Sequence, residues 1–337
     1  MGSNLTIDDI AEALGVSKTT VSRAISGKGR ISKETTERIR AYIERCNFKP
    51  NNYAQGLAKQ RTGNIGVIWP GDSEAVDLPF FQKCLLGINK AASSRGYDLL
   101  ITVVEGDDIS GIRRVTENHK VDGMILTRTL VQDLPSEFLK ESGIPFVAVG
   151  SAADPDVLCV DSSNERACLE LTRDLLKRGA RHLALIGGKS GHMITGTRLR
   201  GFLQGYRAAD MTADESLICM EVKTRQEVEL ALEQVLAAGA DAVIGMDDGI
   251  AGDILSICLR KGIEIPGQLC LASFYDSSVL ENAVPAVTAI RFDDELLGET
   301  AAELLIRRIE GETCCSRMLE NDQIILRETT IREDTEK

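Results

Sequence analysis

Hydrophobic residues at the N-terminal end of the chain recur at the spacing of a helix. The first run places them at intervals of three and four residues: Ile7, Ile10, Ala11 and Leu14. Such a run forms one apolar face of an amphipathic helix. Thr6 stands before the run and Asp9 three residues later, which is the spacing of a capping box. The pattern therefore predicts a helix that begins after Thr6 and ends near Gly15, a residue that permits a tight turn.

A second helix is predicted directly after that turn. Ser17 is placed to cap it, and the run 18–25 turns an apolar face inward. The inward residues are Val21, Ala24 and Ile25. The outward residues are Lys18, Thr19, Ser22 and Arg23. A third helix is predicted over 33–46, with Ser32 as its cap and Ile39, Tyr42 and Ile43 facing the core.

Two helices joined by a glycine turn, the second with a polar and basic outer face, are typical of a helix-turn-helix. Lys and Arg donate to guanine O6 and N7, and Thr and Ser hydroxyls reach base edges or phosphates. We therefore expect base reading to concentrate at Lys18, Thr19 and Arg23. The expected DNA contacts of this segment are Thr6, Ser17, Lys18, Thr19, Thr20, Ser22 and Arg23. The alternative is a three-helix protein-interaction module whose solvated face carries these residues.

A short helical stretch is predicted after Pro50. Residues 51–59 are too few to form a stable helix alone, and Gly56 weakens the stretch further. We expect this segment to fold conditionally.

From residue 64 the pattern changes to short apolar runs that alternate with amphipathic stretches. The runs are 65–68, 99–103, 124–126 and 146–149, then 183–186, 218–222, 242–245 and 269–272. Runs of this length are typical of strands buried on both faces of a parallel sheet. Because the pattern restarts near residue 183, it predicts two doubly wound α/β halves. Such sheets bind ligands beyond the carboxyl ends of their strands.

The net charge of the chain changes sign near the same place, between residues 61 and 62. Residues 1–61 hold eleven Lys and Arg against six Asp and Glu, a net +5, and residues 62–337 hold 28 against 45, a net −17. A basic head suits phosphate contact, whereas an acidic body is repelled by DNA. With 337 residues, 43% of them hydrophobic, the chain is long enough for two or three cores, so we expect a multi-domain protein.

Cysteine, histidine and apolar content argue against several other classes of protein. The nine cysteines form no C-x-x-C pair and lie apart from the three histidines, His119, His182 and His192. We therefore predict no zinc site, no disulfide framework and no cofactor. The N-terminus lacks an apolar leader, and about 18 apolar residues never run together, so we expect a cytoplasmic protein without a membrane span.

The segment from Thr6 to Ile68 resembles the lactose-repressor (LacI/GalR) family. The matching motifs are Thr-Ile-x-Asp-Ile-Ala, Gly-Val-Ser-x-x-Thr-Val-Ser-Arg, Pro-Asn-x-x-Ala-x-x-Leu and Thr-Gly-x-Ile-Gly. The resemblance implies a hinge helix that enters the minor groove as a pair and inserts Leu57 between base steps, with Asn51 and Ala54 as further contacts. Gln55 and Gly56 depart from the family pattern, so this hinge depends more on DNA and partner contacts.

The body is similar to the periplasmic-binding-protein-like core of the same family, and the resemblance ends with an expected strand at 324–327. The resemblance implies three crossings between the halves, near residues 161, 291 and 321, which act as hinges. It divides the chain into a DNA-binding domain at 1–49, a hinge and linker at 50–61, and an effector-binding and dimerisation domain at 62–335. Within that domain one subdomain takes 62–161 and 291–320, and the other takes 162–290 and 321–335.

Effector contacts are carried over where local motifs match. Arg198 lies in the family motif Arg-x-x-Gly-Phe, where its guanidinium would hold sugar hydroxyls or a carboxylate. Asp247 and Tyr275 stand where the family has other ligand contacts. The remaining expected contacts are Trp69, Asp72, Phe80 and Asp276. Packing at the cleft edge is the alternative for Trp69, and a solvated loop position is the alternative for Asp72. The acidic cleft favours a neutral sugar or polyol.

Three other functions are weighed against a regulator with a small-molecule effector. Residues 187–191 read Gly-Gly-Lys-Ser-Gly, but a P-loop needs glycine where Leu183 stands, and no catalytic motif is present, so we expect no enzyme. A transport-type binding protein would lack the head. A regulator whose degenerate cleft responds to a protein remains open.

The preferred model is a homodimer on palindromic operator DNA, because one recognition helix reads only a half-site. The resemblance implies a repressor. The pattern leaves open whether the effector induces or corepresses.

Overall fold

The computed structural model describes residues 5–26, 29–46, 61–72 and 79–331. The chain forms two compact units, Met1–Thr62 and Gly63–Lys337, which are called the head and the body below. The predicted hinge contacts Asn51, Ala54 and Leu57, and nearly all of the predicted 50–61 linker, lie outside the described residues.

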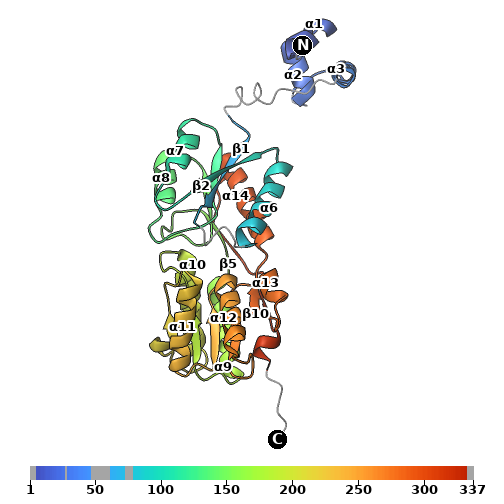
Figure 1. Ribbon diagram of the computed structural model, residues 1–337. Coiled ribbons are helices and arrows are strands. Elements are labelled where there is room, and N and C mark those ends of the chain that lie inside the picture. The colour runs from blue at the N-terminus through green and yellow to red at the C-terminus, as the bar shows by residue number, and fades with distance from the viewer. Residues whose placement is uncertain (1–4, 27–28, 47–60, 73–78, 332–337) are drawn as a thin grey trace. The chain divides into compact units, whose positions relative to one another are not determined.

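The head contains three helices, α1 (Ile7–Leu14), α2 (Lys18–Ser26) and α3 (Lys33–Arg45) (Figure 1). The predicted capping box is confirmed, since the Thr6 side chain accepts from the Asp9 backbone and the Asp9 side chain accepts from the Thr6 backbone. Gly15 has φ 62°, the left-handed conformation that the turn requires. The predicted inward faces meet in one small core, centred on Ile10, Ala11, Val21, Ala24 and Ile39.

The first half of the body is built on an entirely parallel six-stranded sheet in the order β11-β5-β4-β3-β1-β2. The strands are β1 (Asn64–Pro70), β2 (Asp98–Val104), β3 (Gly123–Leu126), β4 (Phe146–Val149), β5 (Cys159–Ser162) and β11 (Arg317–Leu319). The helices are α6 (Pro79–Ser94), α7 (Ser110–Glu117), α8 (Leu134–Ser142) and α14 (Asp294–Ile309). Separate apolar clusters under α6 with α14 and under α7 with α8 show that helices cover both faces of this sheet.

The second half has a six-stranded sheet in the order β12-β10-β9-β8-β6-β7. Its strands are β6 (Leu183–Ile186), β7 (Ile218–Cys219), β8 (Ala242–Gly245), β9 (Cys270–Ser273), β10 (Thr288–Arg291) and β12 (Gln323–Ile325). Its helices are α9 (Asn164–Lys177), α10 (Met193–Arg207), α11 (Arg225–Ala237), α12 (Asp248–Lys261) and α13 (Ser278–Glu281). The edge strand β12 is antiparallel to β10. The prediction of two doubly wound, essentially parallel halves is therefore confirmed.

The chain crosses between the two sheets three times. The chain leaves the first sheet after β5, returns to it after β10, and passes from β11 to β12 at its C-terminal end (Figure 1). These crossings bring the carboxyl ends of strands from both sheets to face one another. Within the described ranges, none of the helices is both long and apolar enough to traverse a bilayer.

Candidate functional site

A cavity of about 320 Å³ lies between the two halves of the body. Residues at the carboxyl ends of eight consecutive parallel strands, β3 to β10, contribute to its wall, including Thr127 after β3, Gly188 after β6 and Met246 after β8. Its position beyond the carboxyl ends of the strands is the one that doubly wound sheets reserve for ligands. The volume lies at the lower end of the range of about 300–1,000 Å³ typical of small-molecule sites.

Arg198 enters the cavity wall from α10. The side chain is 9% exposed, its Nη1 donates to the Met246 carbonyl at 2.8 Å, and its guanidinium carbon lies 5.8 Å from the centre of the Tyr275 ring. Its Nε is buried without a hydrogen-bond partner. A buried donor without a partner costs free energy, so this guanidinium retains capacity for a ligand oxygen.

Two adjacent carboxylates stand at the start of α12. Asp247 caps the helix, with its side chain accepting from the Ile250 N–H at 2.8 Å. Asp248 is 5% exposed, and its Oδ1 has no hydrogen-bond partner. Burial raises the pKa of Asp248, and the neighbouring Asp247 charge raises it further. Asp247 uses a side-chain oxygen to cap α12, whereas Asp248 Oδ1 accepts no hydrogen bond and lies at the cavity.

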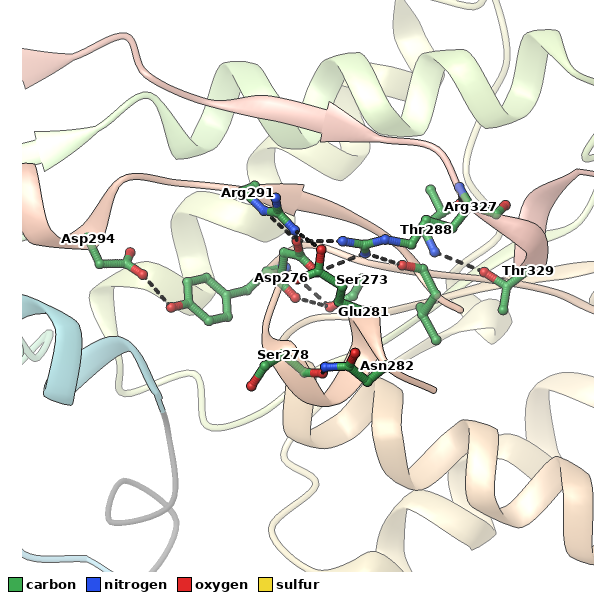
Figure 2. A network of polar contacts seen from close by, with 12 residues as sticks. Ser273, Asp276, Ser278, Glu281, Asn282, Thr288, Arg291, Asp294, Arg327 and Thr329 are labelled. Atoms are coloured by element: carbon green, nitrogen blue, oxygen red, sulfur yellow. Dashed lines mark hydrogen bonds and ion pairs between the residues drawn. The ribbon is translucent and has the colours of Figure 1, made fainter. Parts of the chain in front are cut away.

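The two halves contact each other across the cavity through side chains. Tyr275 follows β9 in the second half, and its hydroxyl donates to Asp294 Oδ2 at 2.6 Å, where α14 of the first half begins (Figure 2). Phe80 from α6 meets the Tyr275 ring edge-on at 6.3 Å between centroids. Tyr275 also stacks with Phe292 at 6.5 Å. Aromatic surface from both halves therefore lines one wall of the cavity.

The backbone joins the halves at a second point. The Val131 N–H donates to the Gly191 carbonyl at 2.9 Å, and the Met193 N–H donates to the Thr129 carbonyl at 3.2 Å. The end of the Gly-Gly-Lys-Ser-Gly run of residues 187–191 takes part in this contact, since the loop after β6 reaches the loop after β3. The run thus helps to close the cavity.

Of the seven predicted effector contacts, four line the cavity and three do not. Phe80, Arg198, Asp247 and Tyr275 line it. Trp69 instead packs against Phe81, with centroids 5.8 Å apart. Asp72 receives hydrogen bonds from both terminal nitrogens of Arg128, at 2.6 and 3.0 Å. The Asp276 carboxylate accepts hydrogen bonds from Arg291 and Arg327, so all three of these side chains lie outside the cavity lining and contact other protein side chains.

Asp276 links the loop after β9 to the end of β10 and to the segment after β12. Figure 2 shows its carboxylate between Arg291 and Arg327, and Arg327 donates to both of its oxygens, at 2.9 and 2.8 Å. Burial alone would raise the pKa of Asp276, but the hydrogen bonds from Arg327 and Arg291 outweigh burial and lower it. The carboxylate is thus ionised and engaged in structure.

The Asp276→Asn substitution is expected to lower the free energy of unfolding by about 2 kcal/mol, because it removes charge from these hydrogen bonds. Since the folded-state pKa is lowered, the difference from wild type is full at neutral pH and shrinks as pH falls below about 4. Denaturant unfolding at several pH values measures this. Glu281→Gln is the matched control, because Glu281 also pairs with Arg291 but is half exposed. Equal losses from both substitutions would contradict the assignment.

Four carboxylates of the cavity lining were not predicted from sequence. Asp253 lies within α12, whereas the other three lie at the ends of elements: Asp161 near the end of β5, Asp248 at the start of α12 and Asp294 at the start of α14. Burial raises the pKa of Asp161 and raises that of Asp294 to about 6. The sequence signal that could have identified Asp161, Asp248 and Asp294 is an Asp near the end of a strand or at the start of the helix that follows a strand.

The predicted recognition face lies on α2. The structure confirms that Lys18, Thr19, Ser22 and Arg23 are exposed. Lys18 forms an ion pair with Asp8 at 2.5 Å, and both side chains are more than half exposed, so DNA can displace this pair at little cost. The hydroxyls of Thr6 and Ser17 serve their helix caps, and Thr20 is half-buried beside Ser17.

The described residues hold no metal-binding cluster. No group of three or more His, Cys, Asp and Glu side chains in these ranges could hold a metal ion, and the nine cysteines are all free thiols. The chemistry of the cavity is therefore that of carboxylates, guanidinium, hydroxyls and aromatic rings.

Comparison with known proteins gives two family matches that together cover most of the chain. Residues 6–51 match the family described as bacterial regulatory proteins, lacI family. Residues 62–328 match the family described as periplasmic binding proteins and sugar binding domain of LacI family. The boundary between the matches falls beside the boundary between head and body.

Individual relatives align over nearly their full length. The HTH-type transcriptional regulator CelR of Thermobifida fusca is 29% identical over 91% of this chain and 93% of its own. The HTH-type transcriptional regulator MalR of Staphylococcus xylosus is 31% identical over 91% of this chain and 92% of its own. A solved CelR–cellobiose complex superposes with a TM-score of 0.72 at 28% identity, covering 96% of this chain and 99% of that chain.

The fold also matches the lac repressor dimer bound to operator and the anti-inducer ONPF. The TM-score is 0.79 at 21% identity, with 98% of this chain and 100% of that chain covered. At this identity the likeness supports the fold.

Proposed function

We propose that this chain, which belongs to the LacI family of bacterial regulatory proteins, is a transcriptional repressor. It acts as a homodimer on palindromic operator DNA in the cytoplasm. The chain is a DNA-binding transcription regulator with a sugar-binding domain. The relatives that support this function are regulators and not enzymes.

The cavity supports an uncharged saccharide or polyol as the effector. Its lining carries five carboxylates and five Lys or Arg side chains, so fixed charge favours neither an anion nor a cation. Sugar hydroxyls both donate to carboxylates and accept from guanidinium groups. The rings of Phe80, Tyr275 and Phe292 supply apolar surface for the C–H face of a sugar ring. The orphaned Nε of Arg198 beside this aromatic wall is the observation that carries the proposal.

One similar structure supports a disaccharide as the first class to test. It is a complex of the regulator CelR with cellobiose, and this chain shares 28% identity with it. We therefore place disaccharides ahead of free monosaccharides.

The proposed mechanism couples closure of the body to the head. An effector that contacts both halves favours one arrangement of the halves about the three crossings. In a dimer this arrangement sets the separation of the paired hinge segments, and thus the free energy of DNA binding. Lys18, Thr19 and Arg23 are the proposed base-reading residues, Thr6, Ser17, Thr20 and Ser22 the proposed phosphate contacts, and Asn51, Ala54 and Leu57 the proposed hinge contacts.

The test is a thermal-shift screen of the full chain with cellobiose, maltose, glucose, sorbitol, gluconate and glucose 6-phosphate. A ligand at about 100 times its Kd adds roughly 2.7 kcal/mol of stability, which raises the melting temperature by several degrees. We expect the shift with a neutral saccharide and little shift with gluconate or the phosphate ester. A thermal shift with gluconate or glucose 6-phosphate alone would reject a neutral saccharide as the effector. No shift with any of the compounds would favour a regulator that responds to a protein.

A further inference from the structure

Asp294 is a buried carboxylate with an incomplete set of hydrogen bonds. The residue is 3% exposed, and its Oδ2 accepts from the Tyr275 hydroxyl at 2.6 Å. The nearest cation, Lys83 Nζ on α6, is 3.7 Å away from the same oxygen. A carboxylate has about four acceptor sites, and one hydroxyl with a distant ammonium leaves the second oxygen, Oδ1, available. Asp294 belongs to the cavity lining, so this acceptor is available to a ligand.

Tyr275 and Asp294 come from opposite sides of the cavity. Tyr275 follows β9 in the second half, whereas Asp294 begins α14, which packs on α6 and on β3, β4 and β5 of the first half. The hydrogen bond between them exists only while the halves are together. A group that binds Asp294 in this position therefore senses the closed arrangement.

We propose that Asp294 is a specificity-determining residue that accepts a hydrogen bond from an effector hydroxyl through Oδ1, and that Tyr275 is the positioning residue that holds it against the cavity. This inference rests on the proposed function, because it assigns a contact within the same saccharide site. It explains why a tyrosine and a carboxylate are paired across the opening instead of two apolar side chains. It also makes the contact conditional on closure, which links recognition of one hydroxyl to the regulatory change.

The surroundings of Asp294 make its proposed contact with the effector depend on pH. Burial raises the pKa of Asp294 to about 6, against the opposing effects of Tyr275, Lys83 and Arg198, and Asp293 raises it. Asp248, at the start of α12, also lines the cavity, and its charge helps to raise the pKa of the Tyr275 hydroxyl. A hydroxyl that donates to Asp294 stabilises its ionised form, so effector binding is stronger above pH 6 and weakens as pH falls through 6.

The experiment measures the Kd of whichever of cellobiose, maltose or sorbitol gives the largest thermal shift with the wild-type chain, from pH 5 to pH 8, by isothermal titration calorimetry. Asp294→Asn keeps an acceptor for Tyr275 but removes the charge, and we expect the Kd at pH 7.5 to rise about tenfold or more and its dependence on pH to flatten. Glu295→Gln is the matched control, because it makes the same change from acid to amide at the next residue of α14. The Glu295 side chain is half exposed and pairs with Lys90. This control is expected to retain the wild-type Kd and pH profile.

Tyr275→Phe separates positioning from direct contact. We expect it to raise the Kd about threefold to tenfold in the wild-type chain and by less than about twofold in the Asp294→Asn chain, because its effect passes through Asp294. Tyr206→Phe is its control, since that buried hydroxyl donates to the Leu183 carbonyl at 2.7 Å in the core of the second half. Equal effects of Tyr275→Phe in both backgrounds would overturn the positioning role.

The outcomes separate this inference from the proposed function. If wild type binds a neutral saccharide but Asp294→Asn has an unchanged Kd and pH profile, the function stands and the inference is rejected. If none of the three probes binds wild type, the neutral-saccharide effector and this inference are both rejected, while the DNA-binding function stands. If Asp294→Asn weakens binding and flattens the profile while Glu295→Gln does not, the inference is supported.

Discussion

Replacement of Arg23 by alanine is expected to abolish operator preference while leaving effector binding intact. Arg23 is exposed on α2, at the position of the outward face that the sequence predicts for base reading. A bidentate arginine contact with a guanine contributes about 1–3 kcal/mol of discrimination. Because a dimer presents two such helices, the loss is about 2–6 kcal/mol, or roughly 30-fold to more than 10,000-fold in specific affinity. Fluorescence anisotropy with operator and scrambled duplexes measures it.

The control for this substitution removes the same charge elsewhere in the head. Arg40 is exposed on α3, so Arg40→Ala is expected to weaken operator and scrambled DNA similarly and slightly, as loss of a phosphate attraction does. Arg23→Ala should instead bring operator affinity down to the level of scrambled DNA. If Arg23→Ala lowers both affinities equally, Arg23 contacts only the phosphate backbone.

Local signals made the head predictable from sequence. The capping box at Thr6, the left-handed Gly15 and the caps at Ser17 and Ser32 all depend on residues within four positions of one another, and each is present in the structure. The cores of both sheets were predictable for the same reason, because strands buried on both faces must be apolar. Fold and family therefore followed from short-range patterns.

Three strands were missed because they lack that pattern. In β5, Asp161 and Ser162 follow two apolar residues, since the strand ends at the cavity. Thr288 and Arg291 bound only two apolar residues in β10. The edge strand β11 is largely exposed. The predicted run at 218–222 forms only the two-residue strand β7, since Met220 and the residues after it leave the sheet for the loop at the cavity.

The cavity was harder to predict because its contacts join distant parts of the chain. Asp276 looked like a ligand residue, but Arg327, 51 residues later, donates to both of its oxygens. Asp294 was not singled out in the sequence, but the structure brings it to Tyr275, 19 residues earlier and in the other half. Side chains at strand ends therefore reveal where a site lies, whereas tertiary partners decide which of them remain available to a ligand.

Replacement of Arg198 by alanine is expected to abolish effector binding while leaving operator binding intact. The guanidinium is nine-tenths buried, is held by the Met246 carbonyl at 2.8 Å, and lies over the Tyr275 ring with its Nε unpartnered. Truncating one partner of a buried, charged hydrogen bond costs about 2–5 kcal/mol, which raises the effector Kd by roughly 30-fold to several thousand-fold. Calorimetry with the best neutral saccharide measures this loss.

Arg200→Ala gives the matched control, two residues along the same helix. Arg200 pairs with Glu165 at 2.8 Å on the surface, and its side chain is 55% exposed, so its loss should leave the Kd nearly unchanged. Removal of Arg198 also leaves Asp247, Asp248 and Asp294 without the guanidinium that lowers their pKa values. The variant is therefore expected to bind protons more readily near neutral pH while its head still recognises the operator. Loss of operator binding together with effector binding would indicate a misfolded body, and an unchanged effector Kd would remove Arg198 from the site.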